Sequence, residues 1–197
     1  MSDRRVVFFG DDIVAGARDA SGLGLVGRLV ASAFVAGIPV SAYNLGVLGD
    51  TSVGVSRRWR KEAGPRVDGS ARWWPVFCFG ANDTAAHAGG TRVASLASVQ
   101  ALQKVLARTL AAGLAPLIVG PPPIGDAAQR ERTVALSSRF ADMCSEHGAQ
   151  FCETSAPLLS SSIWANDLGA HAGLPGAAGY EDLASLVIAA GWLTWLR

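Results

Sequence analysis

The sequence has few of the residues that cross-link a protein or give it a strong charge. Its three cysteines are odd in number and lack metal-ligand spacing, so neither a disulfide framework nor a zinc site is indicated. Seventeen basic and sixteen acidic residues leave a formal net charge of +1. No overall field therefore recruits nucleic acid or an anionic membrane. No apolar stretch approaches the roughly 20 residues of a membrane helix. We expect neither a nucleic-acid nor a membrane partner.

The N-terminal residues also lack a secretory signal. Met-Ser-Asp-Arg-Arg leads directly into an apolar run, with no signal-like apolar region or cleavage site before it. We therefore expect a cytoplasmic protein. Half of the 197 residues are apolar, which suffices for one domain with a sizeable core, whereas the chain is too short for two ordinary domains. We expect a single domain over residues 1–197.

Patterns typical of buried strands alternate with patterns typical of helices along the whole chain. Apolar runs of strand length lie at 6–9, 39–44, 73–79, 114–120 and 150–154. Helical patterns lie at 22–36, after 52, at 95–112 and at 131–147. Such an alternation, without repeats or low-complexity linkers, gives a parallel sheet with helices on both faces. The sequence predicts an α/β protein, a three-layer α/β/α sandwich around a five-stranded parallel sheet.

Two carboxylates stand directly after the first predicted strand. Residues 5–16 read Arg-Val-Val-Phe-Phe-Gly-Asp-Asp-Ile-Val-Ala-Gly, and the apolar run stops at Gly10. Asp11 and Asp12 therefore lie just beyond the carboxyl end of a strand, where ligand sites of open α/β sheets are found. The alternative is that Asp11 only caps the following helix, which requires no chemistry.

The second and third predicted strands end in similar loops. Residues 44–51 read Asn-Leu-Gly-Val-Leu-Gly-Asp-Thr, and residues 80–83 read Gly-Ala-Asn-Asp. Taken singly, Gly49 is typical of a turn and Asn82 of a cap. Three loops of glycine and acid, each directly after a buried strand, favour one shared site. The helix after the second loop carries four cations, at 57, 58, 60 and 61, which we interpret as a solvated face.

These three loops, in this order, resemble blocks I, II and III of the SGNH or GDSL hydrolases. Block I of that family reads Gly-Asp-Ser-Ile/Leu with a glycine three residues later, so its nucleophilic serine corresponds to Asp12. The resemblance covers 6–180 and implies a flavodoxin-like sandwich. It also implies that the backbone N–H of Gly49 and the side-chain amide of Asn82 are oxyanion donors.

The fourth motif of the family, Asp-x-x-His-Pro followed by Gly-Tyr, is degraded. Residues 175–180 read Pro-Gly-Ala-Ala-Gly-Tyr. Counting back from Pro175 places Leu174 at the histidine position and His171 at the aspartate position, which is the register that we prefer because it needs no gap. The alternative register pairs Asp167 with His171 and requires extra residues before the proline. The serine is absent in both.

The resemblance therefore implies retained oxyanion donors without the usual nucleophile. We predict an enzyme in which Asp12 is the general acid or base, His171 is its partner, and Gly49 and Asn82 polarise a small carbonyl-containing substrate. Asp11 belongs to the same substrate-binding group. Isomerisation, cyclisation, elimination or addition fits these residues, as in specialised metabolism. Ordinary ester hydrolysis does not.

Three alternatives stay open. In the first, Asp12 is a covalent nucleophile towards an alkyl or epoxide carbon, and His171 or His87 activates water. In the second, the protein binds a cationic or hydroxylated small molecule through Asp12 and catalyses nothing. In the third, Asp167 and His171 activate water directly for weak esterase activity. We expect a small-molecule substrate, no cofactor and no metal, and the oligomeric state is left open.

Overall fold

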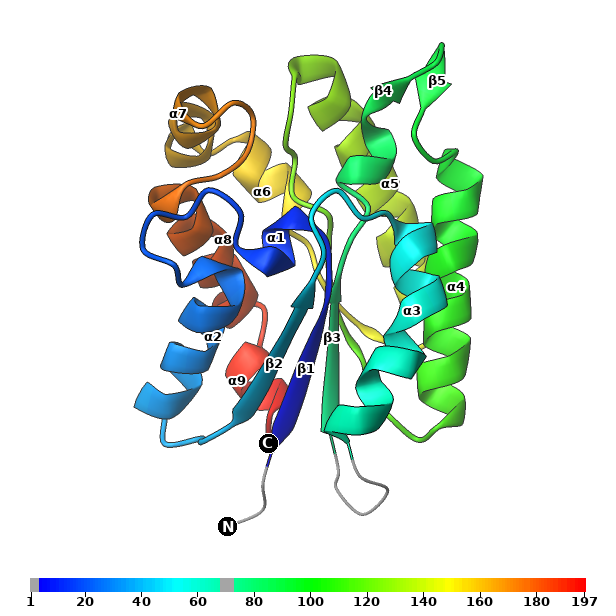
Figure 1. The fold of residues 1–197 in the computed structure, drawn as a ribbon, viewed down its shortest axis with the longest axis vertical. Helices are drawn as coiled ribbons and strands as arrows, with labels where there is room; N and C mark the ends of the chain where they lie inside the picture. The colour runs from blue at the N-terminus through cyan, green and yellow to red at the C-terminus, as the bar shows by residue number, and fades with distance from the viewer. Residues whose placement is uncertain (1–3, 68–72) are drawn as a thin grey trace.

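A computed structural model describes residues 4–67 and 73–197. Its centre is a five-stranded parallel sheet with the strand order β2-β1-β3-β6-β7. The strands are β1 (Arg5–Gly10), β2 (Ser41–Gly46), β3 (Trp73–Cys78), β6 (Leu117–Val119) and β7 (Gln150–Cys152). The predicted five-stranded parallel sheet is confirmed (Figure 1).

Helices cover both faces of the sheet. One face packs against α2 (Gly24–Val35), α8 (Ala177–Ala189) and α9 (Trp192–Trp195). The other packs against α3 (Ser52–Ala63), α4 (Ser95–Ala111) and α5 (Ala127–Glu146). Figure 1 shows these two helical layers on either side of the sheet, so the predicted sandwich is confirmed.

Several boundaries differ from the prediction. The fourth strand spans three residues rather than seven, because Pro116 before it has no N–H for a sheet ladder. Helix α5 begins four residues early, since the Asp126 side chain caps it by accepting from Gln129 N at 2.8 Å. A short helix after Asp11 is present as α1 (Asp12–Ala15), in line with the alternative interpretation of Asp11. The other short elements were not predicted. They are η1 (Gly64–Arg66), η2 (Asn82–Thr84), β4 (Ala86–His87), β5 (Gly90–Thr91), α6 (Ser155–Leu159) and α7 (Ser162–Ala170).

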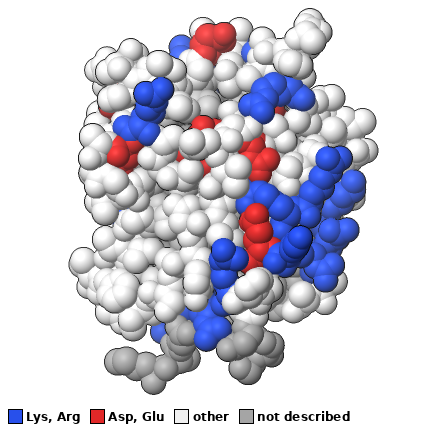
Figure 2. Space-filling view, viewed as in Figure 1, with Lys and Arg blue, Asp and Glu red and all other residues white. Residues whose placement is uncertain are grey.

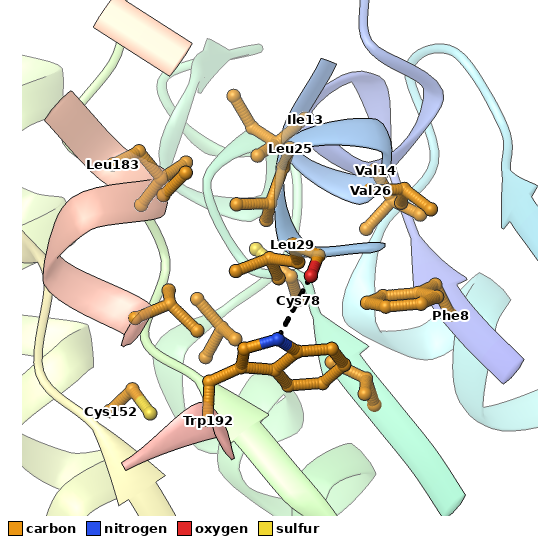
Figure 3. Packing of buried hydrophobic residues seen from close by; sticks show 14 of the residues in the cluster. Phe8, Ile13, Val14, Leu25, Val26, Leu29, Cys78, Cys152, Leu183 and Trp192 are labelled. Carbon is orange, nitrogen blue, oxygen red and sulfur yellow. Dashed lines mark hydrogen bonds between the residues drawn. The ribbon is translucent and has the colours of Figure 1, made fainter. Parts of the chain in front are cut away.

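Strand β1 supplies alternate side chains to two cores, which explains its unbroken apolar run. Val6 and Phe8 point to the α2/α8 side, whereas Val7 and Phe9 point to the α3/α4 side, and none of the four is exposed. On the first side, Phe8 packs near Trp192 of α9 (Figure 3). The Trp192 indole N–H donates to the backbone oxygen of Leu29 at 3.0 Å. This bond ties the C-terminal segment to α2.

The three cysteines, Cys78, Cys144 and Cys152, are buried free thiols. Burial raises the pKa of Cys144 to about 12 and that of Cys152 to about 11, so both stay protonated at neutral pH. Within residues 4–67 and 73–197, every helix is too short or too polar to cross a bilayer.

Candidate active site

The three predicted loops meet at the carboxyl ends of adjacent strands. Gly10, at the end of β1, pairs with Gly46 of β2 on one side and with Cys78 of β3 on the other. A Cβ atom at Gly10 would lie 2.0 Å from the backbone oxygen of Cys78, so only glycine allows this close approach. Because the strands end side by side, the segments that follow them are brought together.

Asp12, Gly49 and Asn82 form the centre of the site. Asp12 is the first residue of α1, and its Oδ2 accepts from Gly49 N at 2.8 Å and from Asn82 Nδ2 at 2.6 Å. Asn82 Nδ2 also donates to the backbone oxygen of Asp50 at 3.1 Å. Gly49 has a φ of +70°, a left-handed conformation that favours glycine, and open space surrounds the position of a Cβ atom. Backbone conformation therefore explains this glycine.

The second carboxylate oxygen of Asp12 is open. Within the described residues Oδ1 accepts no hydrogen bond, and it is not among the buried side-chain atoms that lack a partner. The Asp12 residue is itself partly exposed. One oxygen is thus fixed by two donors, while the other has no hydrogen-bond donor among the described residues and is not fully buried.

Asp11 lies in the interior and caps α1, as the alternative interpretation of its position predicted. It is 1% exposed, and its Oδ1 accepts from Ile13 N at 3.1 Å. Oδ2 is buried and has no hydrogen-bond partner among the described residues. Burial, with smaller contributions from Asp12 and Asp83, raises the pKa of Asp11 to about 8, against the lowering effect of the Ile13 N–H. Asp11 is therefore largely protonated at neutral pH.

Arg58 joins the ends of the first two strands and the loop after the second. Its guanidinium donates to the backbone oxygens of Gly10 at 2.8 Å and Leu45 at 3.0 Å, and it pairs with Asp50 at 2.7 Å. The prediction that this cation belongs to a solvated face was wrong, because its side chain is only 19% exposed. The other three cations of the run are exposed, as predicted.

Asp83, which sequence analysis did not assign to the site, holds the third loop in place. Its buried carboxylate accepts from Ser52 N at 2.9 Å, from the Ser52 hydroxyl and from Ser98 Oγ at 2.6 Å. These bonds join the loop after β3 to the first turns of α3 and α4. The available signal was the single acid of Gly-Ala-Asn-Asp, directly after Asn82.

Two further side chains attach neighbouring elements to the site. Arg92 Nη2 donates to the backbone oxygen of Gly49 at 2.7 Å. The Tyr180 hydroxyl shares its proton between the backbone oxygens of Asp12 at 3.2 Å and Ala17 at 3.0 Å, which ties α8 to the first residue of α1 and to the turn after α1. Burial raises the pKa of the Tyr180 phenol well above its usual range. Tyr180 is thereby kept as a neutral donor.

The part of the sequence that contains these three loops matches a known family. The model of the GDSL-like Lipase/Acylhydrolase family matches residues 8–181. The chain belongs to this family. The match spans all three loops of the site as well as the segment that leads into α8. No curated protein matches the chain.

Solved structures agree on the fold of this GDSL-family chain. A lipase/acylhydrolase from Enterococcus faecalis is 23% identical with a TM-score of 0.72, and the match covers 94% of each chain. Axe2, an acetylxylan esterase from Geobacillus stearothermophilus, is 17% identical with a TM-score of 0.77, covering 96% of this chain and 94% of that one. LAE5, an alpha/beta hydrolase enzyme from the metagenome of Lake Arreo, Spain, is 20% identical with a TM-score of 0.73 and 98% coverage of both. At these identities the likeness concerns the fold.

In this GDSL-family chain Asp167 and His171 are in contact, which is the pair that the alternative register of the fourth motif named. His171 Nδ1 lies 2.8 Å from the backbone oxygen of Asp167 and 3.3 Å from its Oδ1. The other oxygen of Asp167 accepts from Gly176 N at 2.6 Å and Gly179 N at 2.7 Å, which caps α8. Leu174 packs against the core on the α2/α8 side.

The histidines do not contact Asp12. Among the described residues no hydrogen bond or ion pair joins His171 to Asp12, and the His171 side chain is 37% exposed. His87 lies exposed in the β4/β5 hairpin. His147 ends α5, where Nδ1 lies 2.9 Å from the backbone oxygen of Met143. In the described part of the chain, no three His, Cys, Asp or Glu side chains gather in a metal-binding arrangement.

Proposed function

We propose that this GDSL-family protein is an enzyme that moves a proton on a small carbonyl compound, with Asp12 as the general base. The observation that carries the proposal is the attachment of Asp12: two donors hold Oδ2, and Oδ1 is left open. A fixed carboxylate with one free oxygen is suited to accept a proton. The resemblance of block I, which puts Asp12 at the serine position, supports chemistry other than serine-type ester hydrolysis.

The proposed step is proton abstraction next to a carbonyl group. Asp12 Oδ1 takes the proton, the C–H electron pair forms the C=C bond of an enolate, and the carbonyl oxygen takes the negative charge. Return of the proton to another carbon completes an isomerisation, whereas loss of a leaving group from the β-carbon completes an elimination. Positioned base catalysis of this kind contributes about 10² to 10⁴ in rate.

In this proposal Gly49 and Asn82 act both before and after the proton is transferred to Asp12. Without substrate both donate to Asp12 Oδ2. When Asp12 takes the proton it becomes neutral, and hydrogen bonds to a neutral group are about half as strong as bonds to a charged one. The enolate oxygen then becomes the better acceptor for the same two N–H groups. We propose that the donors first orient the base and then stabilise the enolate.

His171 takes no step in this proposal. Its ring contacts Asp167 at the end of α7, and a histidine that binds this helix terminus has a structural reason for its position. Asp11 does not touch the substrate either, because it is buried.

A specific observation favours one second candidate, covalent attack by Asp12. Oδ1 would attack an alkyl or epoxide carbon, and the electron pair of the broken bond would leave with the halide or the epoxide oxygen. Oδ2 would become the carbonyl oxygen of the resulting ester, already bonded to Gly49 and Asn82. Since no histidine contacts Asp12 in the described residues, we expect the ester to accumulate. Intact-protein mass after incubation with a small epoxide tests this, and an unmodified protein contradicts it.

The main proposal is tested by deuterium exchange. The protein is incubated in D₂O with acetylacetone, ethyl acetoacetate and dihydroxyacetone, and loss of the C–H signals is followed by NMR. We expect exchange on at least one compound to be faster with the natural protein than with Asp12→Asn by about 10² or more. Asparagine has the same shape and keeps an oxygen for the two donors, so we expect this variant to fold.

The matched control is Asp142→Asn, which changes an exposed carboxylate on α5 and should leave exchange unchanged. Equal exchange by Asp12→Asn and the natural protein on every compound would contradict the proposal. An Asp12→Asn change that alters only the affinity for a small ligand, in a protein that never catalyses exchange, would favour the non-catalytic interpretation.

A further inference from the structure

Outside the Asp12 site, exposed cations gather on one side of the molecule. Figure 2 shows Lys and Arg side chains concentrated over α3 and α4. A groove of about 440 Å³ lies between these helices, and we call it the α3/α4 groove. Arg57 of α3 lines one wall, Lys104 and Arg108 of α4 line the other, and Ser56 and Gln100 add polar groups. Among the described residues, no carboxylate lines this groove.

The cations of the α3/α4 groove repel one another in the unliganded protein. Lys104 and Arg108 are four residues apart on α4 and therefore neighbours on one face, where like charges destabilise a helix. Within residues 4–67 and 73–197, none of Arg57, Lys104 and Arg108 has an ion pair. An anion placed between the two walls would neutralise all three. The groove is thus complementary to a short, multiply charged anion.

A second hollow of about 210 Å³ continues from the groove. Arg108 lines both spaces, and the second is also lined by Arg60, Trp59 and Trp73. Trp59 is buried, and its ring packs against Phe9 and Phe77 in the core. The half-buried Trp73 supplies the aromatic surface that a ligand can reach. The hollow therefore adds aromatic surface beside the cations of the groove.

We propose that the α3/α4 groove and this hollow together bind a nucleotide with two or more phosphates. The phosphates lie among Arg57, Lys104 and Arg108, because guanidinium groups bind phosphate oxygens through paired N–H donors. The ring lies in the hollow beside Trp73, where aromatic surface suits a base. Arg108, which borders both spaces, contacts the phosphate nearest the sugar.

This proposal is independent of the Asp12 chemistry. Its residues lie on the outer side of α3 and α4, and none of them bonds to Asp12, Gly49 or Asn82 in the described part of the chain. Variants in the groove should leave Asp12-dependent exchange unchanged. The two proposals can therefore fail separately.

Calorimetric titration of the full chain at low ionic strength, without divalent metal, tests the proposal. The titrants are ADP, ATP, AMP and pyrophosphate. We expect ADP and ATP to bind more tightly than both AMP and pyrophosphate, since AMP lacks the phosphate chain and pyrophosphate lacks the ring. Added NaCl should weaken binding, because exposed charges are screened.

Arg108→Gln should weaken ADP binding by about tenfold or more, the order expected when a charged hydrogen-bonding partner is removed. The matched control is Lys61→Gln, an exposed cation of α3 that lines neither space, and it should bind ADP normally. Arg108→Gln should also melt no lower than the natural protein without ligand, because it relieves repulsion from Lys104. Lys104→Gln provides a second variant with the same expectation.

Three results would overturn the proposal. Absence of ADP and ATP binding would show that the groove holds no nucleotide. Equal affinity for pyrophosphate and ADP would show an anion site without a base pocket. Tight binding of heparin or single-stranded DNA, with no binding of ADP, would assign the cations to a macromolecular polyanion.

Discussion

Replacement of Asp11 by asparagine should flatten the dependence of stability on pH. Burial raises the pKa of the Asp11 carboxyl to about 8 in the folded protein, against 3.8 for the unfolded chain. Between these values the folded state holds a proton that the unfolded state has released. The free energy of unfolding therefore falls as pH rises. The stabilisation that Asp11 contributes is fully present below its unfolded pKa of 3.8 and is lost as the pH rises to its folded pKa of about 8.

The size of the effect on the free energy of unfolding follows from a difference of one bound proton between the folded and unfolded states. A difference of one bound proton changes the free energy of unfolding by about 1.4 kcal/mol per pH unit. Between pH 5 and pH 7, which lie inside the window, the natural protein should lose about 2.7 kcal/mol through Asp11 alone. Asp11→Asn keeps an oxygen for the Ile13 N–H and has no proton to release. Between pH 5 and pH 7 the free energy of unfolding of Asp11→Asn should therefore fall by about 2.7 kcal/mol less than that of the natural protein.

Urea denaturation at a series of pH values measures the difference. Titration of the three histidines contributes equally to both proteins and cancels in the comparison. Asp142→Asn, which changes an exposed carboxylate, should keep the slope of the natural protein. Parallel curves for the natural protein and Asp11→Asn would refute the reasoning, because they would mean that Asp11 is ionised at pH 7 despite its burial.

Two other predictions concern the backbone and the fourth motif. Gly49→Ala should lower the free energy of unfolding by about 1 to 2 kcal/mol, because alanine is strained at a φ of +70°. Gly169→Ala, in an open position on α7, should be neutral or stabilising in the same urea measurement. The triple variant with Asp12→Ser, His171→Asp and Leu174→His should hydrolyse p-nitrophenyl acetate above background if the gap-free register is correct. A folded but inactive triple variant would instead favour the register of Asp167 and His171.

Local signals were enough to predict the sheet and the three loops. The apolar run of β1 is continuous because its side chains enter two cores, and its interruption by Gly10 and two carboxylates is typical of a strand end. The meeting of Asp12, Gly49 and Asn82 follows from parallel strands that end at one edge. That the two donors bind Asp12 itself was not predicted, because it depends on where the Asp12 side chain points.

The histidine region was harder to predict because its geometry comes from α7. Counting residues back from Pro175 favoured Leu174 and His171, whereas Asp167 and His171 are the residues in contact. Residues four apart at a helix end are neighbours, but the sequence of α7 carries only a weak helical pattern. The burial of Asp11 and Asp83 could not be predicted from the sequence either. Both carboxylates stand in loops, and burial depends on elements distant in the sequence, such as α3 and α4 around Asp83.

N–H donors at the positions of Gly49 and Asn82 do not by themselves indicate hydrolysis. In this protein Gly49 and Asn82 have a partner without any substrate, because a carboxylate at position 12 places one oxygen against both N–H groups. Loss of either donor would leave part of the Asp12 charge unpaired, which is costly in a partly buried site. The two donors therefore stabilise the ionised Asp12 without substrate, apart from the role that we propose for them in the reaction. Their presence is explained by Asp12 alone and does not require that the protein hydrolyse esters.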